Sequence, residues 1–486
     1  MLKLKDETLL KSDAYVNGAW IAADGGARFA VTNPSTGETI ADVADLSEVE
    51  TRRAIEAAAE AWPLWRKKTA KERAVLMRRY FDLIMANQED LARIMTAEQG
   101  KPLAETRGEV AYGASFIEWF AEEGKRVYGD VIPTNVGGRR IIVLKEPIGV
   151  VAAITPWNFP NAMITRKLAP ALAAGCPILI KPPSETPLSA LALAELAQRA
   201  GIPKGVVNIL TTSKSSKVGG EMTSNPLVRK FSFTGSTQIG KLLMQQCAST
   251  VKKTSMELGG NAPFIVFDDA DLDAAADSAM ASKFRNMGQT CVCANRILVQ
   301  DKVYDAFAEK FAARIAKLKV GDGFEDGVTQ GPLITMKAVE KVEHLLKDAV
   351  DHGAKVVQGG ARIKGQFFEP TLVSGVTPKM EIAREEIFGP VATLFRFKTD
   401  DEAIRIANDT EYGLAAYFYA RDVGRIFRVA EALEYGILGI NEGIISTEVA
   451  PFGGMKESGL GREGSKYGIE DYLEIKYLAL GGLGDI

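Results

Sequence analysis

Histidine is the scarcest reactive residue in this sequence: the 486-residue chain contains only His344 and His352. Both stand in a charged stretch that is typical of a solvated helix face. A hydrolase of the Cys-His kind needs an imidazole to take the proton from its thiol. The sequence therefore disfavours that class of enzyme, and the base for any reactive cysteine would be a carboxylate, a lysine or water.

Cysteine is also rare, and long apolar runs are missing. Four cysteines, two of them separated by one residue, form no disulfide framework and favour a reducing compartment. The first residues include acids where a signal peptide needs apolar side chains, and no apolar run approaches the ~18 residues of a membrane span. The net charge of −3 gives no field for nucleic acid or an acidic membrane. We expect a cytoplasmic protein that binds neither, and we identify no metal site.

The composition, 46% hydrophobic and 25% charged, is that of a globular protein, and its length requires two or three domains. Apolar residues at helical spacing predict two or three helices within 49–62 and 71–97. From about residue 141, short apolar strands alternate with helices, which indicates βαβ units and a parallel sheet. A second alternating region runs from about 262 to 440.

Residues 284–293 (FRNMGQTCVC) carry the strongest chemical signal in the chain. Cys291 follows a Gly-Gln-Thr turn, Arg285 lies six residues upstream, and Cys293 lies two residues downstream. Taken alone, Cys291 is better explained as a small buried hydrophobe, since most free cysteines are. The other motifs of the chain reverse that judgement.

Two glycine motifs are false matches. Residues 459–464 (GLGREG) fit the dinucleotide glycine pattern, but no strand leads into them and no βαβ unit follows, so we interpret them as a turn. Residues 235–241 (GSTQIGK) lack the hydroxyl that would bind magnesium in a phosphate loop, because Leu242 follows. Gly235 and Ser236 still stand between a strand and a helix, so the segment is either a phosphate contact or an ordinary capped helix.

Another polar group follows the strand at 178–180. Lys181 and Ser184 stand there in a proline-stiffened turn, and parallel sheets bind ligands at such strand ends. In isolation, a surface lysine is the simpler interpretation.

Seven motifs occur in a particular order over about 300 residues: 155–160 (TPWNFP), 181–184 (KPPS), 233–237 (FTGST), 256–261 (MELGGN), 288–291 (GQTC), 385–390 (EEIFGP) and 451–454 (PFGG). In this series the chain resembles the aldehyde dehydrogenase superfamily along essentially its whole length. Through residues 162–167, 284–286, 291–293 and 442–446 it is most similar to the succinate-semialdehyde dehydrogenases.

The resemblance implies roles for the reacting residues. Cys291 would attack the aldehyde carbonyl, and the Asn158 amide would stabilise the oxyanion together with the backbone N–H of Cys291. Glu257 would be the general base that activates water against the thioester. Alternatively Glu257 is a surface ion-pair residue, but its apolar and glycine neighbours argue for a dry setting that raises its pKa.

The resemblance also implies a dinucleotide site, with Lys181 and Glu386 on ribose hydroxyls and with Trp157 and Phe388 along the nicotinamide channel. Ser184 stands where NAD-preferring relatives usually carry an acid, so we expect NADP, with NAD as the alternative. Glu185 would reverse this argument if it turned inward. The complete set of expected cofactor residues is Thr155, Pro156, Trp157, Lys181, Ser184, Gly235, Ser236, Leu258, Glu386 and Phe388.

For the substrate, the resemblance implies succinate semialdehyde, oxidised through a thiohemiacetal and a thioester. Arg166 and Arg285, supported by Ser446, are the candidates to bind the substrate carboxylate, although arginines near sites also serve in structural ion pairs. Glutarate semialdehyde, or another aldehyde in an enzyme of broader specificity, is the alternative. A CoA-acylating enzyme and a non-catalytic protein are disfavoured by Glu257 and the complete catalytic set. Cys293 is either a redox partner of Cys291 or a packing residue.

The implied fold is α/β: a Rossmann-like cofactor domain (1–123 and 147–258), a related catalytic domain (259–455), and a small β oligomerisation flap (124–146 and 456–486). The C-terminal tail at 472–478 alternates like a β-strand and has no obvious partner in the sequence, which fits a strand added to another subunit's sheet. A homodimer or homotetramer is expected.

Overall fold

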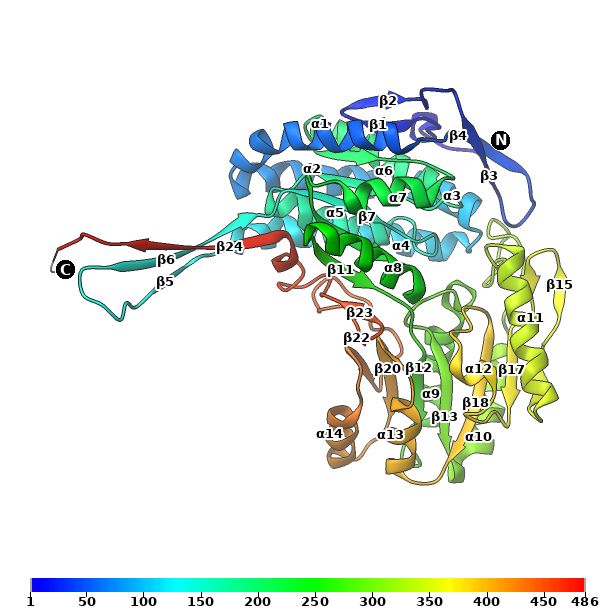
Figure 1. Ribbon diagram of the computed structural model, residues 1–486. Coiled ribbons are helices and arrows are strands. Elements are labelled where there is room, and N and C mark those ends of the chain that lie inside the picture. The colour runs from blue at the N-terminus through cyan, green and yellow to red at the C-terminus, as the bar shows by residue number, and fades with distance from the viewer. Residues whose placement is uncertain (1, 485–486) are drawn as a thin grey trace.

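Two parallel-rich sheets and a projecting arm organise the chain (Figure 1). The computed structural model describes residues 2–484, so Met1 and residues 485–486, at the ends of two predicted segments, lie outside it. The predicted alternation of strands and helices is confirmed, and helices pack on both sheets. No helix within residues 2–484 is long and apolar enough to cross a membrane.

Helical segments account for both predicted amphipathic regions. The region 71–97 divides at Asn87, which ends one helix and begins the next. The helices are α1 Glu48–Lys67, α2 Ala70–Ala86, α3 Gln88–Gln99, α4 Leu103–Glu123, α5 Ala162–Ala174, α6 Pro187–Arg199, α7 Ser215–Ser224, α8 Thr237–Cys247, α9 Leu272–Phe284, α10 Tyr304–Ile315, α11 Met336–Asp351, α12 Glu381–Arg384, α13 Asp400–Asn408 and α14 Val423–Ala432.

The first sheet has eight strands in the order β2-β1-β9-β8-β7-β10-β11-β23, and its five strands from β9 to β11 run parallel. β23 joins it from the end of the chain, antiparallel to β11, so the interpretation of residues 459–464 as a turn was wrong for 459–460, which form an edge strand. The bounds are β1 Ala14–Val16, β2 Ala19–Ile21, β7 Val150–Ile154, β8 Ile178–Lys181, β9 Val207–Ile209, β10 Val228–Thr234, β11 Lys253–Glu257 and β23 Gly459–Leu460.

The second sheet has seven strands in the order β14-β17-β18-β13-β12-β20-β21, all parallel except β14. Its central strands are buried runs of apolar residues, as expected for a sheet covered on both faces. The bounds are β12 Ala262–Val266, β13 Ala294–Gln300, β14 Lys355–Gln358, β17 Thr371–Ser374, β18 Val391–Phe397, β20 Ala415–Tyr419 and β21 Ile437–Ile440.

Three strand pairs lie outside the two large sheets: β3 Arg28–Thr32 with β4 Thr39–Ala44, β15 Arg362–Lys364 with β16 Phe367–Phe368, and β19 Tyr412–Gly413 with β22 Met455–Lys456.

The projecting arm is an antiparallel sheet of β5 Asp130–Ile132, β6 Arg140–Pro147 and β24 Leu473–Leu480, in the order β24-β6-β5 (Figure 1). The expectation that the C-terminal tail lacks a partner in its own chain was wrong. β24 pairs with β6 over its full length, because the alternating residues of 140–147 supply a matching strand more than 300 positions away. The two segments predicted to form the flap therefore do lie together.

Candidate active site

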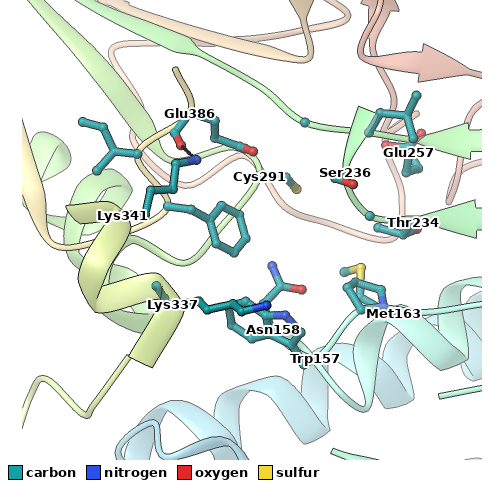
Figure 2. Close-up of a pocket in the computed structure, with 17 residues that line it drawn as sticks. Trp157, Asn158, Met163, Thr234, Ser236, Glu257, Cys291, Lys337, Lys341 and Glu386 are labelled. Atoms are coloured by element: carbon teal, nitrogen blue, oxygen red, sulfur yellow. Dashed lines mark hydrogen bonds between the residues drawn. The ribbon is translucent and has the colours of Figure 1, made fainter. Parts of the chain in front are cut away.

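A cavity of about 370 Å³ lies where the two sheets approach each other (Figure 2). Cys291, Glu257 and Asn158 all line it, so the structure brings the three predicted catalytic residues to one place. The other lining residues are Pro156, Trp157, Met163, Thr234, Gly235, Ser236, Leu258, Gly259, Lys337, Ala338, Lys341, Glu386, Ile387 and Phe388.

Cys291 and Asn158 are linked through the loop at 285–291, here called the nucleophile loop. The Asn158 side-chain nitrogen Nδ2 donates to the Gln289 carbonyl at 3.0 Å, two residues before Cys291. Its second N–H is therefore available to an oxygen atom bound at the cavity. Burial raises the pKa of Cys291 to about 12, and the negative charge of Glu257 adds to the effect while the charge of Arg166 opposes it. The Cys291 thiol is therefore neutral in the protein alone.

The loop before Cys291 has an unusual backbone. Asn286 (φ 50°), Met287 (φ 58°) and Gly288 (φ 73°) follow one another in the left-handed region, which side chains other than glycine rarely adopt. Asn286 is held there by its side chain, which accepts from Gln99 at 2.9 Å and donates to the Asn158 carbonyl at 3.0 Å. Strain of this kind persists only where surrounding contacts enforce it.

Glu257 ends β11 and is 4% exposed. Neither of its carboxylate oxygens has a hydrogen-bond partner among the described residues. Burial, and next the charge of Glu463, raises the pKa of Glu257 well above its usual value. A Cβ atom at Gly453 would stand 2.6 Å from the Gly461 carbonyl oxygen and 3.0 Å from Glu257 Oε1, which explains why glycine is needed in the segment 451–454. The predicted dry setting of Glu257 is confirmed.

A buried group of charges lies behind Glu257. Lys167 Nζ is 2.5 Å from Glu463 Oε1, and Arg166 Nε is 2.7 Å from Glu463 Oε2, without the angle of a directed hydrogen bond. Burial opposes ionisation of Glu463, but the two cations prevail and its pKa is lowered. Glu463 follows β23 and forms a β-bridge with Phe452. Nothing in the sequence indicated its role, because no motif marks a charge partner of this kind.

Most of the predicted cofactor residues line the cavity. The Trp157 and Phe388 rings meet edge to face with centroids 5.5 Å apart. Burial raises the pKa of Glu386 to about 7, and its Oε1 accepts from the Gly260 N–H at 3.1 Å. Ser236 is the N-cap of α8, but its hydroxyl makes no capping hydrogen bond. This last observation favours a phosphate contact over an ordinary capped helix.

Three predicted cofactor residues lie outside this cavity, at adjacent strand ends. Lys181 ends β8, and the Thr155 N–H donates to its carbonyl at 3.2 Å. Burial lowers the pKa of Lys181 to about 8. The Ser184 hydroxyl donates to Glu185 at 3.1 Å. A buried cation, an unpartnered Thr155 hydroxyl and the α8 N-terminus form a donor set that suits a dinucleotide.

The candidate carboxylate ligands also lie outside the cavity lining. Arg285 is half-buried, with its Nη2 3.5 Å from the Ser446 hydroxyl and its guanidinium 5.1 Å from the Phe159 ring centre. Among the described residues it has no ion-pair partner. Arg166, by contrast, is paired with Glu463 and stacked 3.9 Å from the Phe452 ring centre. The structure thus distinguishes two arginines that the sequence left equivalent.

Cys293 is buried beneath the loop, where its thiol donates to the carbonyls of Lys283 at 3.4 Å and Ala294 at 3.6 Å. Burial raises the pKa of this thiol. These contacts fit the packing interpretation, while the redox role stays a prediction. Within residues 2–484 no group of three or more His, Cys, Asp or Glu side chains is arranged to hold a metal ion.

Sequence analysis missed two lysines of the cavity, Lys337 and Lys341 on α11. Lys341 Nζ donates to the backbone carbonyl of Glu386 at 2.6 Å (Figure 2). α11 is amphipathic and carries no motif, so only its position against the loop at 386–388 identifies these residues.

Comparisons with known proteins agree with this geometry. The sequence pattern of the "Aldehyde dehydrogenase family" matches residues 20–478. The chain is 65% identical to the glutarate-semialdehyde dehydrogenase of Pseudomonas putida, and 63% identical to the NADP(+) succinate-semialdehyde dehydrogenase of Escherichia coli; each alignment covers 99% of this chain and 100% of the relative. The crystal structure of a succinate-semialdehyde dehydrogenase from Burkholderia pseudomallei superposes with a TM-score of 0.98 at 62% identity, covering 98% of this chain and 99% of that one. This chain belongs to the aldehyde dehydrogenase family, and it is an enzyme that acts on small aldehydes with NAD(P).

Proposed function

We propose that the protein oxidises succinate semialdehyde to the dicarboxylic acid, with NADP as the electron acceptor. The observation that carries the substrate class is Arg285, a half-buried guanidinium without an ion-pair partner among the described residues, next to the Ser446 hydroxyl. It lies six residues before Cys291, on the segment that approaches the substrate. An arginine of this kind binds a carboxylate through charge-assisted hydrogen bonds.

The proposed chemistry begins at Cys291. Its thiol loses a proton to Glu257 or to water as the sulfur attacks the aldehyde carbon, and a thiohemiacetal forms. The Asn158 amide and the Cys291 N–H donate to the oxyanion. Trp157 and Phe388 would hold a nicotinamide that serves as the hydride acceptor, and loss of the hydride would leave the acyl group on Cys291 as a thioester. Glu257 then takes a proton from water, which attacks the thioester and releases the acid.

A dry carboxylate suits this last step. Because the pKa of Glu257 is raised, its ionised form is a stronger base than an exposed glutamate, and no described side chain competes for its oxygens. An enzyme that passes its acyl group to CoA must protect the thioester from activated water. The position of Glu257 in the same cavity as Cys291 therefore disfavours that reaction.

Glutarate semialdehyde is the second candidate substrate, and it is favoured by the 65% identity to the Pseudomonas putida enzyme of that name. The two semialdehydes carry the same two functional groups and differ by one methylene. In an apolar pocket a methylene is worth only about 1–3 kcal/mol, so one enzyme can accept both.

NADP is favoured by Ser184, which presents no charge to a 2′-phosphate, and by the NADP named for the Escherichia coli relative. Lys181 supplies a buried cation near the ribose position. NAD remains the alternative, because the Glu185 carboxylate already lies against Ser184 at 3.1 Å and would accept from a 2′-hydroxyl. Binding of NADP requires this carboxylate to turn outward.

We propose a homodimer or homotetramer because of the surface that the projecting arm exposes. Val131 (75%), Tyr128 (70%), Ile475 (69%) and Tyr477 (61%) are strongly exposed apolar side chains on or beside its strands. β24 and β5 are also its two edge strands. Apolar side chains and unpaired strand edges of this kind are usually covered by another chain.

A panel of aldehydes with both cofactors tests the proposed function. Succinate and glutarate semialdehydes should give kcat/KM at least about tenfold above butanal, and Arg285→Ala should raise KM for the semialdehydes while butanal is unaffected. Arg166→Ala is the matched control. It leaves Glu463 buried beside Glu257 with one cation fewer, so it should slow all three aldehydes alike. Equal effects of Arg285→Ala on butanal and the semialdehydes would refute the proposed carboxylate site.

A further inference from the structure

Two fully buried charges lie beneath the segment that carries Asn158. Lys101 stands in the turn between α3 and α4, and Glu109 lies on α4. Their side chains are each 1% exposed, and Lys101 Nζ is 2.5 Å from Glu109 Oε2. A buried ion pair is seldom retained for stability alone, because desolvating two charges offsets most of their attraction. Its other contacts indicate what it does.

Both charges bind the backbone around Asn158. Lys101 Nζ donates to the Asn158 carbonyl at 2.7 Å and lies 4.1 Å from the centre of the Phe159 ring. Glu109 Oε1 accepts from the N–H groups of Asn161 at 2.9 Å and Ala162 at 3.3 Å. These two N–H groups belong to the start of α5, where no side-chain cap is present, and a carboxylate is favoured there. The pair therefore holds the segment at 158–162 at both ends.

A second set of hydrogen bonds connects the Asn158 carbonyl to the nucleophile loop. Asn286 Nδ2 donates to the Asn158 carbonyl at 3.0 Å, and Gln99 Nε2 donates to Asn286 Oδ1 at 2.9 Å. Gln99 Oε1 in turn accepts from the Lys101 N–H at 3.0 Å. Lys101 thus contacts the Asn158 segment directly and the nucleophile loop through Gln99. The position of the Asn158 amide relative to Cys291 depends on this one network.

We propose that Lys101 and Glu109 are positioning residues, which fix the Asn158 amide where it meets the oxyanion formed on Cys291. The inference rests on the proposed role of Asn158. Oxyanion donors act only when they are held 2.7–3.1 Å from the developing charge, and loss of one costs about 10²–10³ in kcat. A small displacement of the segment should therefore lower kcat and leave the affinities for aldehyde and cofactor nearly unchanged.

The experiment is a mutant cycle on the full-length protein. The double variant Lys101→Met/Glu109→Gln removes both charges, keeps the side-chain volume, and keeps an amide oxygen for the α5 N–H groups. We expect kcat to fall about 10–100-fold, the range seen when supporting residues of a site are removed, with the Kd for NADPH by fluorescence within twofold of wild type. If Lys101 and Glu109 act through Asn158, the triple variant with Asn158→Ala should lose no more than Asn158→Ala alone.

Glu98→Gln provides the matched control. Glu98 is also fully buried on α3, and it accepts from the Leu188 and Ser189 N–H groups at the start of α6, but among the described residues it makes no hydrogen bond to the Asn158 segment. Its kcat at saturating cofactor should equal that of wild type. If the double variant does not fold, Lys101→Arg carries the same cycle with a smaller loss, because it keeps both charges and changes only the shape of the group that binds the Asn158 carbonyl.

The possible results distinguish a failure of the positioning role of Lys101 and Glu109 from a failure of the proposed role of Asn158. A wild-type kcat in the double variant, or losses that multiply with that of Asn158→Ala, would show that the buried pair serves the fold only. An effect below tenfold for Asn158→Ala itself would instead remove the oxyanion role of Asn158, and the positioning role of the pair with it.

Discussion

The two sheets contribute opposite kinds of group to the cavity. The eight-stranded sheet supplies Glu257 at the end of β11, backed by the charges of Arg166, Lys167 and Glu463. The loop that leads into β13 of the seven-stranded sheet supplies Cys291, a neutral thiol on a strained segment held by amide hydrogen bonds. On one side of the cavity, nearby charges set the proton affinity of Glu257. On the other side, hydrogen bonds set the position of Cys291.

This difference indicates how the reaction is divided. Attack on the aldehyde depends on where the Cys291 sulfur and the oxyanion donors lie, whereas hydrolysis of the thioester depends on the protonation state of Glu257. Because Glu257 makes no hydrogen bond to the loop of Cys291 among the described residues, a substitution of Glu257 should leave the geometry of that loop intact. The two half-reactions are therefore separable by mutation.

Loss of the nucleophile has the largest expected effect. Cys291→Ala should abolish aldehyde oxidation, since no second thiol lines the cavity among the described residues. The Kd for NADPH, measured by fluorescence, should stay within a few-fold of wild type, because Cys291 is not among the residues proposed to bind the dinucleotide. Retention of measurable NADP reduction with the semialdehyde would contradict the covalent mechanism.

Substitution of the base should separate the half-reactions. Glu257→Gln should give a burst of about one NADPH per site and then stall at the thioester, because attack precedes hydrolysis. Burial raises the pKa of Glu257, so the carboxylate is protonated and inactive as a base below that pKa and ionised above it. In wild type, kcat should therefore fall as the pH is lowered through a value well above 4.5. The residual turnover of Glu257→Gln should not show this fall. Equal loss of burst and turnover would contradict the assigned role.

The sequence predicted much of this arrangement for a physical reason. Cys291, Glu257 and Asn158 belong to the ordered motifs that carry the family resemblance, which implied their roles, and the alternation of strands with helices indicated the parallel sheets. Contacts that depend on distant segments were not predictable. Glu463 approaches Arg166 from almost 300 residues away, and the register in which β24 pairs with β6 is set across a similar separation.

The protonation state of Cys291 could not be predicted from the sequence, for a different reason. The sequence shows which charges stand near a thiol in the chain, but desolvation depends on what packs around it. Burial outweighs the cation of Arg166, so the free enzyme holds a neutral thiol. The same limit applies to Arg166 and Arg285, because only the fold shows which of the two already has a counter-ion.

Substitutions that change the preference between NADP and NAD should have a more modest effect. They concern only residues that follow a strand of the eight-stranded sheet. Ser184→Glu adds a carboxylate beside the ribose position and should lower kcat/KM for NADP at least about tenfold, roughly 1.4 kcal/mol, with NAD nearly unchanged. Glu185→Gln is the control, and it should raise kcat/KM for NADP because it removes the carboxylate next to Ser184. A wild-type enzyme that strongly prefers NAD would show that Glu185, and not Ser184, governs the choice.

The smallest effect is expected at Cys293, on the nucleophile side. Its thiol donates to two backbone carbonyls and is shielded from solvent, so Cys293→Ala should keep wild-type kcat. With both thiols neutral, peroxide should inactivate the free enzyme slowly, and dithiothreitol should restore wild type and Cys293→Ala to the same extent. Recovery of wild type alone would instead show that Cys293 protects Cys291 through a strained, easily reduced disulfide. That result would require the loop to open, because the packed conformation leaves Cys293 bound to the carbonyls of Lys283 and Ala294.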